Sequence, residues 1–340
     1  MNPQDLLSAL GKGSRFALSR ILSLVEADTP QGRELLDALH AHTGRAHKIG
    51  ITGPSGSGKS TLVSGMARAL RQLPGHPRVA ILAVDPTSPF TGGAILGDRV
   101  RMADLNGDEG VFIRSLATRG ALGGLSDRTE ALAQVFDAAG YDFILIETVG
   151  AGQSEVEIVK LAHTVIVVDV PGLGDDIQSI KAGILEIADV FVINKADHPG
   201  ASESQHHLQT MIQLGFHAGD PQASHHGQRF AQSPAEPEEN RTSANWVPAV
   251  LLTVANRSEG IDALVTEVLA HATWLRQTGA WQAKDEEAIR REIEKLLLAE
   301  LWKNQIGLIP TAVFDEQIRL ATERKCSPGQ VVQYLLTYNC

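Results

Sequence analysis

The sequence predicts an α/β fold in which a doubly wound, mostly parallel sheet forms the centre and helical segments extend it at both ends. The first observation is a series of seven short, nearly uninterrupted apolar runs between residues 49 and 254. Helical stretches and Gly-rich turns separate these runs, and a parallel sheet that is covered on both faces requires strands of this kind. The second observation is the helical spacing of apolar residues before residue 46 and after residue 272.

The predicted elements follow one another along the chain. Residues 5–45 are expected to be helical, with a break at Thr29-Pro30. Residues 217–245 are polar and rich in Gln, Ser, Pro, Glu and His, which indicates an exposed loop. The expected domains are a helical arm over 1–45, an α/β domain over 46–272 and a second helical arm over 273–340. The predicted strands are residues 49–52, 79–85, 111–117, 143–147, 165–170, 190–194 and 250–254.

Composition and charge exclude several classes of protein. The formal net charge of −10 argues against a general nucleic-acid or anionic-membrane binder, because no excess positive field attracts polyanions. Two cysteines, Cys326 and Cys340, are too few for a disulfide framework or a cysteine-based metal site. No apolar run approaches the roughly 20 residues that span a bilayer, and the first residues lack a secretory pattern. We therefore expect a cytoplasmic protein that binds neither nucleic acid nor membrane.

The segment after the first predicted strand matches a phosphate-binding pattern. It reads Gly53-Pro-Ser-Gly-Ser-Gly-Lys-Ser60, which fits G-x-x-x-x-G-K-[ST] between a strand and a helix. Its glycines let backbone N–H groups point inward around phosphates, and the helix N-terminus adds a favourable dipole. Lys59 is expected to bridge the β- and γ-phosphates, and the Ser60 hydroxyl to bind Mg²⁺. The predicted phosphate-binding residues of this loop are Gly53, Ser55, Gly56, Ser57, Gly58, Lys59 and Ser60.

A second motif, Asn194-Lys195-Ala196-Asp197, follows the predicted strand 190–194. Asp197 can accept two hydrogen bonds, from the ring N–H and the exocyclic amine of guanine, and adenine lacks that donor pair. A site built around such pairing discriminates by up to about ten-thousandfold. Asn194 is expected to brace the loop, and the Lys195 stem to cover the base. The two motifs in this order predict binding of GTP and GDP in preference to ATP.

A carboxylate ends the predicted strand 143–147, beside the phosphate-binding loop. Glu147 at this position is expected to hold Mg²⁺, and Gly150 is expected to give its backbone N–H to the γ-phosphate. The usual switch is Asp-x-x-Gly, whereas Glu-x-x-Gly in this chain is one methylene longer. Asp85 and Asp98 are expected near the carboxyl edge of the sheet, where they complete the metal shell.

The residue after Gly150 predicts slow intrinsic hydrolysis. It is Ala151, whereas Ras-like enzymes place there the glutamine that orients the attacking water. The missing group is then supplied by rearrangement or by a partner. The sequence leaves several candidates for this group open: Gln153, Arg99, Arg101, Arg119 and Lys181.

These residues lie within longer stretches that resemble a known family. The stretches 83–102, 113–126, 147–155 and 170–197 are similar, in this order, to the MeaB/ArgK-type GTPases, also called methylmalonyl-CoA mutase-associated GTPases. The likeness covers roughly residues 5–275. After residue 275 the chain resembles the helical C-terminal extension of the family only by position and helical character.

The resemblance implies a metallochaperone-like role. Such GTPases dimerise, bind an adenosylcobalamin-dependent acyl-CoA mutase, and use GTP binding and hydrolysis to gate loading of intact cofactor and removal of damaged cofactor. It also implies that Thr61 joins Lys59 and Ser60 at the phosphates and Mg²⁺. Residues 153–157 are then expected in a switch, and residues 174–181 in a further mobile loop that senses the partner. The residues then expected to act in hydrolysis are Lys59, Glu147, Gln153, Asp175 and Lys181.

One departure from the family pattern follows the last predicted strand. The chain has Thr253-Val-Ala-Asn256, where the family usually shows Ser-Ala. The resemblance implies that this loop backs the edge of the base, and the backbone N–H groups of Val254 and Ala255 are expected to serve there.

Three alternatives stay open at this point. A nickel- or zinc-delivery GTPase requires soft or imidazole ligands, and the best pairs, His206-His207 and His225-His226, lie in or next to the polar stretch. A kinase or ATPase linked to amino-acid transport conflicts with the guanine motif. A binding module that no longer turns over conflicts with the presence of Lys59, Ser60 and Glu147.

Overall fold

The computed structural model describes most of the chain, and it divides into two compact units. The units are Met1–Trp281 and Gln282–Cys340. The expected domain limits at 45/46 and 272/273 stay predictions. The residues described are 2–85, 102, 105, 107–117, 124–148, 154–172, 186–217, 245–307 and 309–338.

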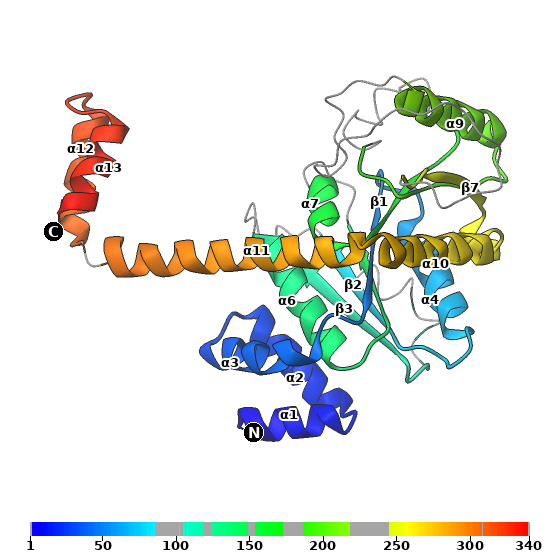
Figure 1. Cartoon of the computed structure of the whole chain (residues 1–340), viewed down its shortest axis with the longest axis horizontal. Coiled ribbons are helices and arrows are strands. Elements are labelled where there is room, and N and C mark those ends of the chain that lie inside the picture. Colours follow the sequence, from blue (N-terminus) through cyan, green and yellow to red (C-terminus); the bar gives the residue numbers. More distant parts are fainter. Residues whose placement is uncertain are drawn as a thin grey trace. The chain divides into compact units, whose positions relative to one another are not determined.

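A seven-stranded sheet forms the centre of the first unit (Figure 1). Its strand order is β3-β2-β4-β1-β5-β6-β7, and every neighbouring pair is parallel. The predicted doubly wound fold is confirmed, and each of the seven apolar runs forms a strand. The strands are β1 His47–Thr52, β2 Val79–Asp85, β3 Val111–Ala117, β4 Phe143–Glu147, β5 Thr164–Asp169, β6 Val190–Asn194 and β7 Ala249–Thr253.

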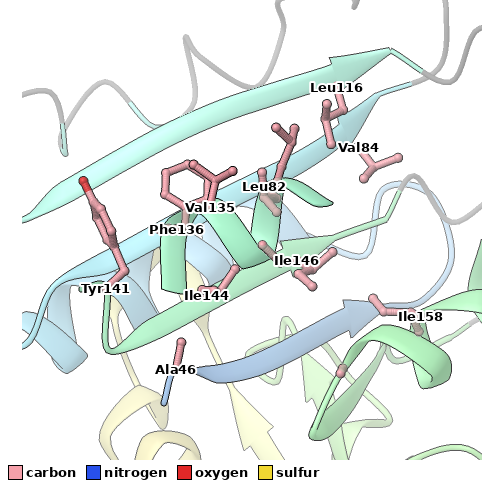
Figure 2. Packing of buried hydrophobic residues seen from close by; sticks show 14 of the residues in the cluster. Ala46, Leu82, Val84, Leu116, Val135, Phe136, Tyr141, Ile144, Ile146 and Ile158 are labelled. Atoms are coloured by element: carbon pink, nitrogen blue, oxygen red, sulfur yellow. The ribbon is translucent and has the colours of Figure 1, made fainter. Parts of the chain in front are cut away.

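Helices cover both faces of this sheet. Alternate residues along each strand point to opposite faces, so Val79 and Ile81 join one apolar cluster while Ala80 and Leu82 join the other. On the Ile81 side the sheet packs against α4 (Lys59–Arg71) and α10 (Ile261–Thr278). On the Leu82 side it packs against α6 (Gly124–Ala138), α7 (Ser154–Leu161) and α9 (Ala201–His217). Figure 2 shows the second cluster, with Phe136 and Val135 of α6 close to Leu82 and Ile144.

The N-terminal segment forms three helices, α1 (Pro3–Gly11), α2 (Arg15–Glu26) and α3 (Pro30–Leu39). The predicted break at Thr29-Pro30 is confirmed, because the Thr29 hydroxyl accepts from the Gly32 N–H and caps α3. A second break was not expected. It lies at Gly13, whose φ of 79° ends α1, and at Ser14, whose side chain caps α2. Helices α2 and α3 pack against α6, outside the sheet layer.

A chain of polar contacts crosses the amino edge of the sheet, opposite the ends of the strands that carry the sequence motifs. His47 Nε2 on β1 lies 2.7 Å from Thr164 Oγ1 on β5, and the same hydroxyl lies 2.8 Å from His271 Nδ1 on α10. His271 Nε2 is 3.4 Å from Asp189 Oδ1. The side chains of His47, Thr164 and His271 are all buried. These contacts fix the start of the two central strands to α10.

Every described secondary-structure element of the second unit is a helix. It contains most of α11 (Ala280–Leu301), a π-helical segment (Trp302–Ile306), α12 (Thr311–Thr322) and α13 (Pro328–Thr337). Helix α12 packs against α13. No helix in the part of the chain that the structure describes has the length and apolar character needed to cross a bilayer. Several large apolar side chains of α11 are exposed: Ile289, Ile293, Leu296, Leu297, Leu298 and Leu301.

Candidate nucleotide-binding site

The sequence motifs come together because all strands of the sheet run in the same direction. The carboxyl ends of β1, β4, β6 and β7 therefore meet at one edge. In open parallel sheets, ligands bind in the crevice outside this edge. The loop after β1, residues 53–58, leads directly into α4, whose first residue is Lys59. The amino end of α4 thus presents backbone N–H groups at this edge.

Two glycines of this loop lie where a larger residue would collide with a neighbouring strand or side chain. Gly53 has a φ of 139°, and a Cβ added there would lie 2.0 Å from the carbonyl oxygen of Val168 on β5. Gly58 has a φ of 91°, and its Cβ would lie 2.4 Å from Asn194 Nδ2. The loop is therefore packed closely against β5 and against the second motif.

Lys59 folds back into the curve of the loop. Its buried Nζ donates to the carbonyl oxygens of Gly53, at 2.8 Å, and Pro54, at 2.9 Å. These contacts place the ammonium within the loop, at the amino end of α4. A cation and a helix N-terminus at the same point form a phosphate-binding arrangement.

Ser60 and Glu147 form a pair of oxygen donors next to Lys59. The Ser60 hydroxyl donates to Glu147 Oε1 at 2.6 Å, and both side chains are buried. A hydroxyl and a carboxylate are hard ligands of the kind that Mg²⁺ prefers, so this donor set fits the metal. Thr148, the next residue, donates its hydroxyl to Thr52 at 3.0 Å and its backbone N–H to Ile51. These bonds hold the end of β4 beside the end of β1.

Asn194 connects three loops of the site. Its Nδ2 donates to the carbonyl oxygen of Ser57 at 2.8 Å. Its Oδ1 accepts from the Thr253 hydroxyl and from the Ala255 N–H, both at 3.1 Å. The Asn194 side chain is buried, so it joins the phosphate-binding loop to the loops that follow β6 and β7.

The other residues of the second motif extend this connection. Lys195 has a φ of 57°, which turns the chain after β6, and its Nζ donates to the carbonyl oxygen of Gly56 at 2.9 Å. The Ala196 N–H donates to the carbonyl oxygen of Thr253. Asp197 Oδ2 lies 3.3 Å from Arg257 Nη2. The motif is therefore fixed to both neighbouring loops, and Asp197 lies at its outer end.

The loop after β7 differs from the expectation in what its N–H groups contact. The Val254 N–H donates to the carbonyl oxygen of Glu259, and the Ala255 N–H donates to Asn194. Both residues are buried. In this structure these groups brace the loop, and their expected contact with the base stays a prediction.

Sequence reasoning missed the roles of three polar residues at this edge. The Thr253 hydroxyl and Arg257 contact the second motif, as described above. Asp169 ends β5, next to β1, and burial raises the pKa of its carboxyl, partly offset by a hydrogen bond from the Val170 N–H. The signal for Asp169 was present, because it is an acid at the end of an apolar run.

Some predicted residues lie wholly or partly outside the described part of the chain. The structure describes the backbone of Asp85, at the end of β2 beside β4, but not its side chain. Among the described residues, no group of three or more His, Cys, Asp or Glu side chains gathers in a way that would hold a metal ion. His206 and His207 lie exposed on α9. The predicted residues outside the described ones are Asp98, Arg99, Arg101, Arg119, Gly150, Ala151, Gln153, Asp175, Lys181, His225 and His226.

The parallel sheet, the glycine loop and the motif after β6 define a P-loop nucleotide-binding protein of the GTPase class. The profile of one family, described as methylmalonyl Co-A mutase-associated GTPase MeaB, matches residues 18–307. The chain belongs to this family.

Comparison with individual proteins agrees with this assignment. The chain is 40% identical over 332 residues to a protein of Pyrococcus abyssi named as a candidate GTPase, with 98% of this chain and 95% of the relative covered. It is 34% identical over 312 residues to GTPase ArgK of Escherichia coli K12, with 88% of this chain and 86% of ArgK covered. A crystal structure of a LAO/AO transport system kinase matches with a TM-score of 0.67 and 25% identity, over 99% of this chain and 97% of that one.

The close packing of Gly58 against Asn194 leads to a testable difference between two glycines. Gly56 and Gly58 both have positive φ, but a Cβ at Gly56 would meet nothing within 4 Å. Both alanine variants carry the left-handed backbone strain, while Gly58→Ala also displaces the Asn194 amide from Ser57. Without nucleotide, we expect Gly58→Ala to be less stable than Gly56→Ala by about 1–3 kcal/mol, the cost of unpairing buried polar groups. Urea unfolding measures this difference, and equal stabilities would contradict it.

Proposed function

We propose that the protein binds GTP and GDP with Mg²⁺ at this edge of the sheet, hydrolyses GTP, and acts as a chaperone for an adenosylcobalamin-dependent acyl-CoA mutase. The observation that carries the nucleotide part is the Asn194 link, which joins a phosphate-binding loop to a base-reading motif at hydrogen-bonding distance. The family description supports the mutase part. So does a mouse relative named methylmalonic aciduria type A homolog, which is 38% identical over 206 residues, 56% of this chain and 49% of that protein.

The phosphates are bound by the loop, by Lys59 and by the amino end of α4. Lys59 Nζ is held inside the loop, and Thr61 lies in the first turn of α4. In the proposed complex Lys59 would contact the β- and γ-phosphates, with Thr61 beside them. Ser60 and Glu147 hold Mg²⁺, with Asp85 and Asp98 as further proposed ligands. When bound, the metal supplies neutralisation of phosphate charge.

The base is read by Asp197. Its carboxylate accepts from the two guanine donors, while the buried Asn194 keeps the loop in place and the Lys195 stem lies over the base. Adenine would leave the carboxylate without those donors, which is the physical basis of the preference for guanine.

Hydrolysis is slow unless a partner assists it. Water attacks the γ-phosphate in line, and the fixed positive charge of Lys59 stabilises the charge that develops on the phosphate oxygens. Gln153 of the switch, with Asp175 and Lys181 of the loop that senses the partner, are the groups proposed to complete this arrangement when the mutase binds. Coupling hydrolysis to partner binding lets nucleotide state gate the loading and removal of the cobalamin cofactor.

The protein acts as a homodimer through α11. Four of its exposed apolar residues, Ile289, Ile293, Leu296 and Leu297, recur at spacings that place them on one side of a helix. A stripe of this kind on a protein in water marks a contact surface.

Replacing Lys59 tests the phosphate assignment. We expect Lys59→Ala to lower GTP turnover by at least about a hundredfold, because a fixed positive charge at the developing negative charge is lost. Steady-state phosphate release measures this. Lys12→Ala, at an exposed lysine after α1, is the matched control and should keep wild-type turnover. Unchanged turnover in Lys59→Ala would remove this lysine from the phosphate site.

Adding a mutase tests the chaperone assignment. Phosphate release is measured with the purified protein alone and with a candidate adenosylcobalamin-dependent acyl-CoA mutase. We expect slow release alone and faster release with the client mutase, and no acceleration in the Lys59→Ala variant. If no mutase of this class changes the rate, the GTPase assignment stands and the chaperone assignment falls.

The dimer assignment predicts the effect of one charge on the α11 stripe. Leu297→Glu places a carboxylate in the proposed contact, so we expect a dimer for the wild type and a monomer for this variant by light scattering. Lys295→Glu also changes charge on α11 but lies outside the stripe, and it should stay dimeric. A monomeric wild type, or a dimeric Leu297→Glu variant, would contradict the assignment.

A further inference from the structure

We propose that Arg257 is a positioning residue for guanine recognition: it orients the Asp197 carboxylate so that both guanine donors are met at once, and so sets discrimination between guanine and hypoxanthine nucleotides. The inference rests on the proposed guanine site. It concerns a residue that lies neither in the phosphate-binding loop nor in the Asn194–Asp197 motif.

Arg257 and Asp197 form an ion pair in which the two side chains contact each other directly. Arg257 Nη2 lies 3.3 Å from Asp197 Oδ2, while Arg257 Nη1 is 4.0 Å from Glu259 Oε1. The Asp197 side chain is 29% exposed and the Arg257 side chain 58% exposed. The carboxylate is thus accessible to a ligand at the same time as one of its oxygens faces the guanidinium.

The backbone that carries Arg257 is held tightly. Ala255–Arg257 forms a turn of 3-10 helix, and the Arg257 N–H donates to the carbonyl oxygen of Val254 at 2.9 Å. Val254 and Glu259 form an antiparallel bridge around this turn. Gly260 closes it with a φ of 77°, where an added Cβ would lie 2.3 Å from the Leu252 carbonyl oxygen. The position of the Arg257 Cα is therefore set by the fold.

The same turn is fixed to the loop that carries Asp197. The Ala255 N–H and the Thr253 hydroxyl both donate to Asn194 Oδ1, and the Ala196 N–H donates to the Thr253 carbonyl oxygen. Arg257 and Asp197 are therefore carried by two segments that cannot shift independently. The ion pair joins the outer ends of these segments, beyond the buried bonds.

The chemistry of the base explains why the orientation of Asp197 matters. Guanine presents a ring N–H and an exocyclic amine side by side, so both carboxylate oxygens must lie in the plane of the base. The terminal torsion of an aspartate is broad, which spreads a free carboxylate over many orientations. Because a carboxylate offers about four lone-pair sites, one contact with a guanidinium leaves enough acceptors for both guanine donors. Hypoxanthine lacks the exocyclic amine, so it donates only one hydrogen bond and needs only one of the carboxylate acceptors.

The opposite role for Arg257 gives the opposite result. If the guanidinium occupied the lone pairs that guanine requires, it would compete with the nucleotide, and removing it would tighten binding. The two roles are therefore separated by the sign of the change in affinity.

Binding of GDP and inosine diphosphate to Arg257→Ala tests the inference, with calorimetry as the measurement. We expect the affinity for GDP to fall and the preference for GDP over inosine diphosphate to drop about fivefold, the range of an exposed ion pair. Arg257→Lys keeps a positive charge and should recover part of the preference. Arg33→Ala removes another exposed ion pair, with Asp28 at 2.7 Å on the N-terminal helices, and is the control that should keep both affinities.

The outcomes separate this inference from the site on which it rests. An unchanged preference in Arg257→Ala, or tighter GDP binding, would overturn the positioning role. Asp197→Asn is measured in parallel, because it should move preference toward xanthosine diphosphate. If Asp197→Asn shows that change while Arg257→Ala shows none, the guanine site stands and only Arg257 is removed from it. If Asp197→Asn keeps its preference for GDP, the guanine site itself is wrong.

Discussion

The amide of Asn194 is the interaction on which the arrangement of the site depends. A single buried side chain donates to Ser57 of the phosphate-binding loop and accepts from Thr253 and Ala255 after β7. Such a contact is possible only where the ends of β1, β6 and β7 meet, and the parallel sheet brings them to one edge. Loss of this amide would leave several buried polar groups unpaired, which costs far more free energy than one exposed hydrogen bond.

The proposed recognition of the phosphates and the proposed recognition of the base are consequently not separate properties of this fold. A side chain at Gly58 would displace the Asn194 amide that lies against it, and Lys195 donates to Gly56 in the same loop. A change of conformation in the phosphate-binding loop would therefore be felt directly at the motif after β6. Neither motif, taken alone as a pattern of letters, contains this dependence.

The sequence predicted the sheet well because a buried parallel strand has a strong local signal, an apolar run bounded by turns. Both nucleotide motifs were found for a similar reason, since their residues are contiguous. The break at Gly13 was missed, because helical spacing continues across it when α1 and α2 are read as one pattern. Arg257 was missed because its contact with Asp197 spans two loops. The expected roles of Asp98 and Gln153 lie outside the described residues.

The polar chain at the amino edge of the sheet has a direction. When His271 is neutral with its hydrogen on Nε2, the nitrogen that faces the Asp189 carboxylate, its Nδ1 is the acceptor of the Thr164 hydroxyl proton. Thr164 has one proton to give, so its oxygen accepts from His47 Nε2–H. In that neutral state, one aspartate sets the tautomers of both imidazoles, His47 on β1 and His271 on α10. The hydrogens along this line then all point toward Asp189, at the edge of the sheet opposite the proposed nucleotide site.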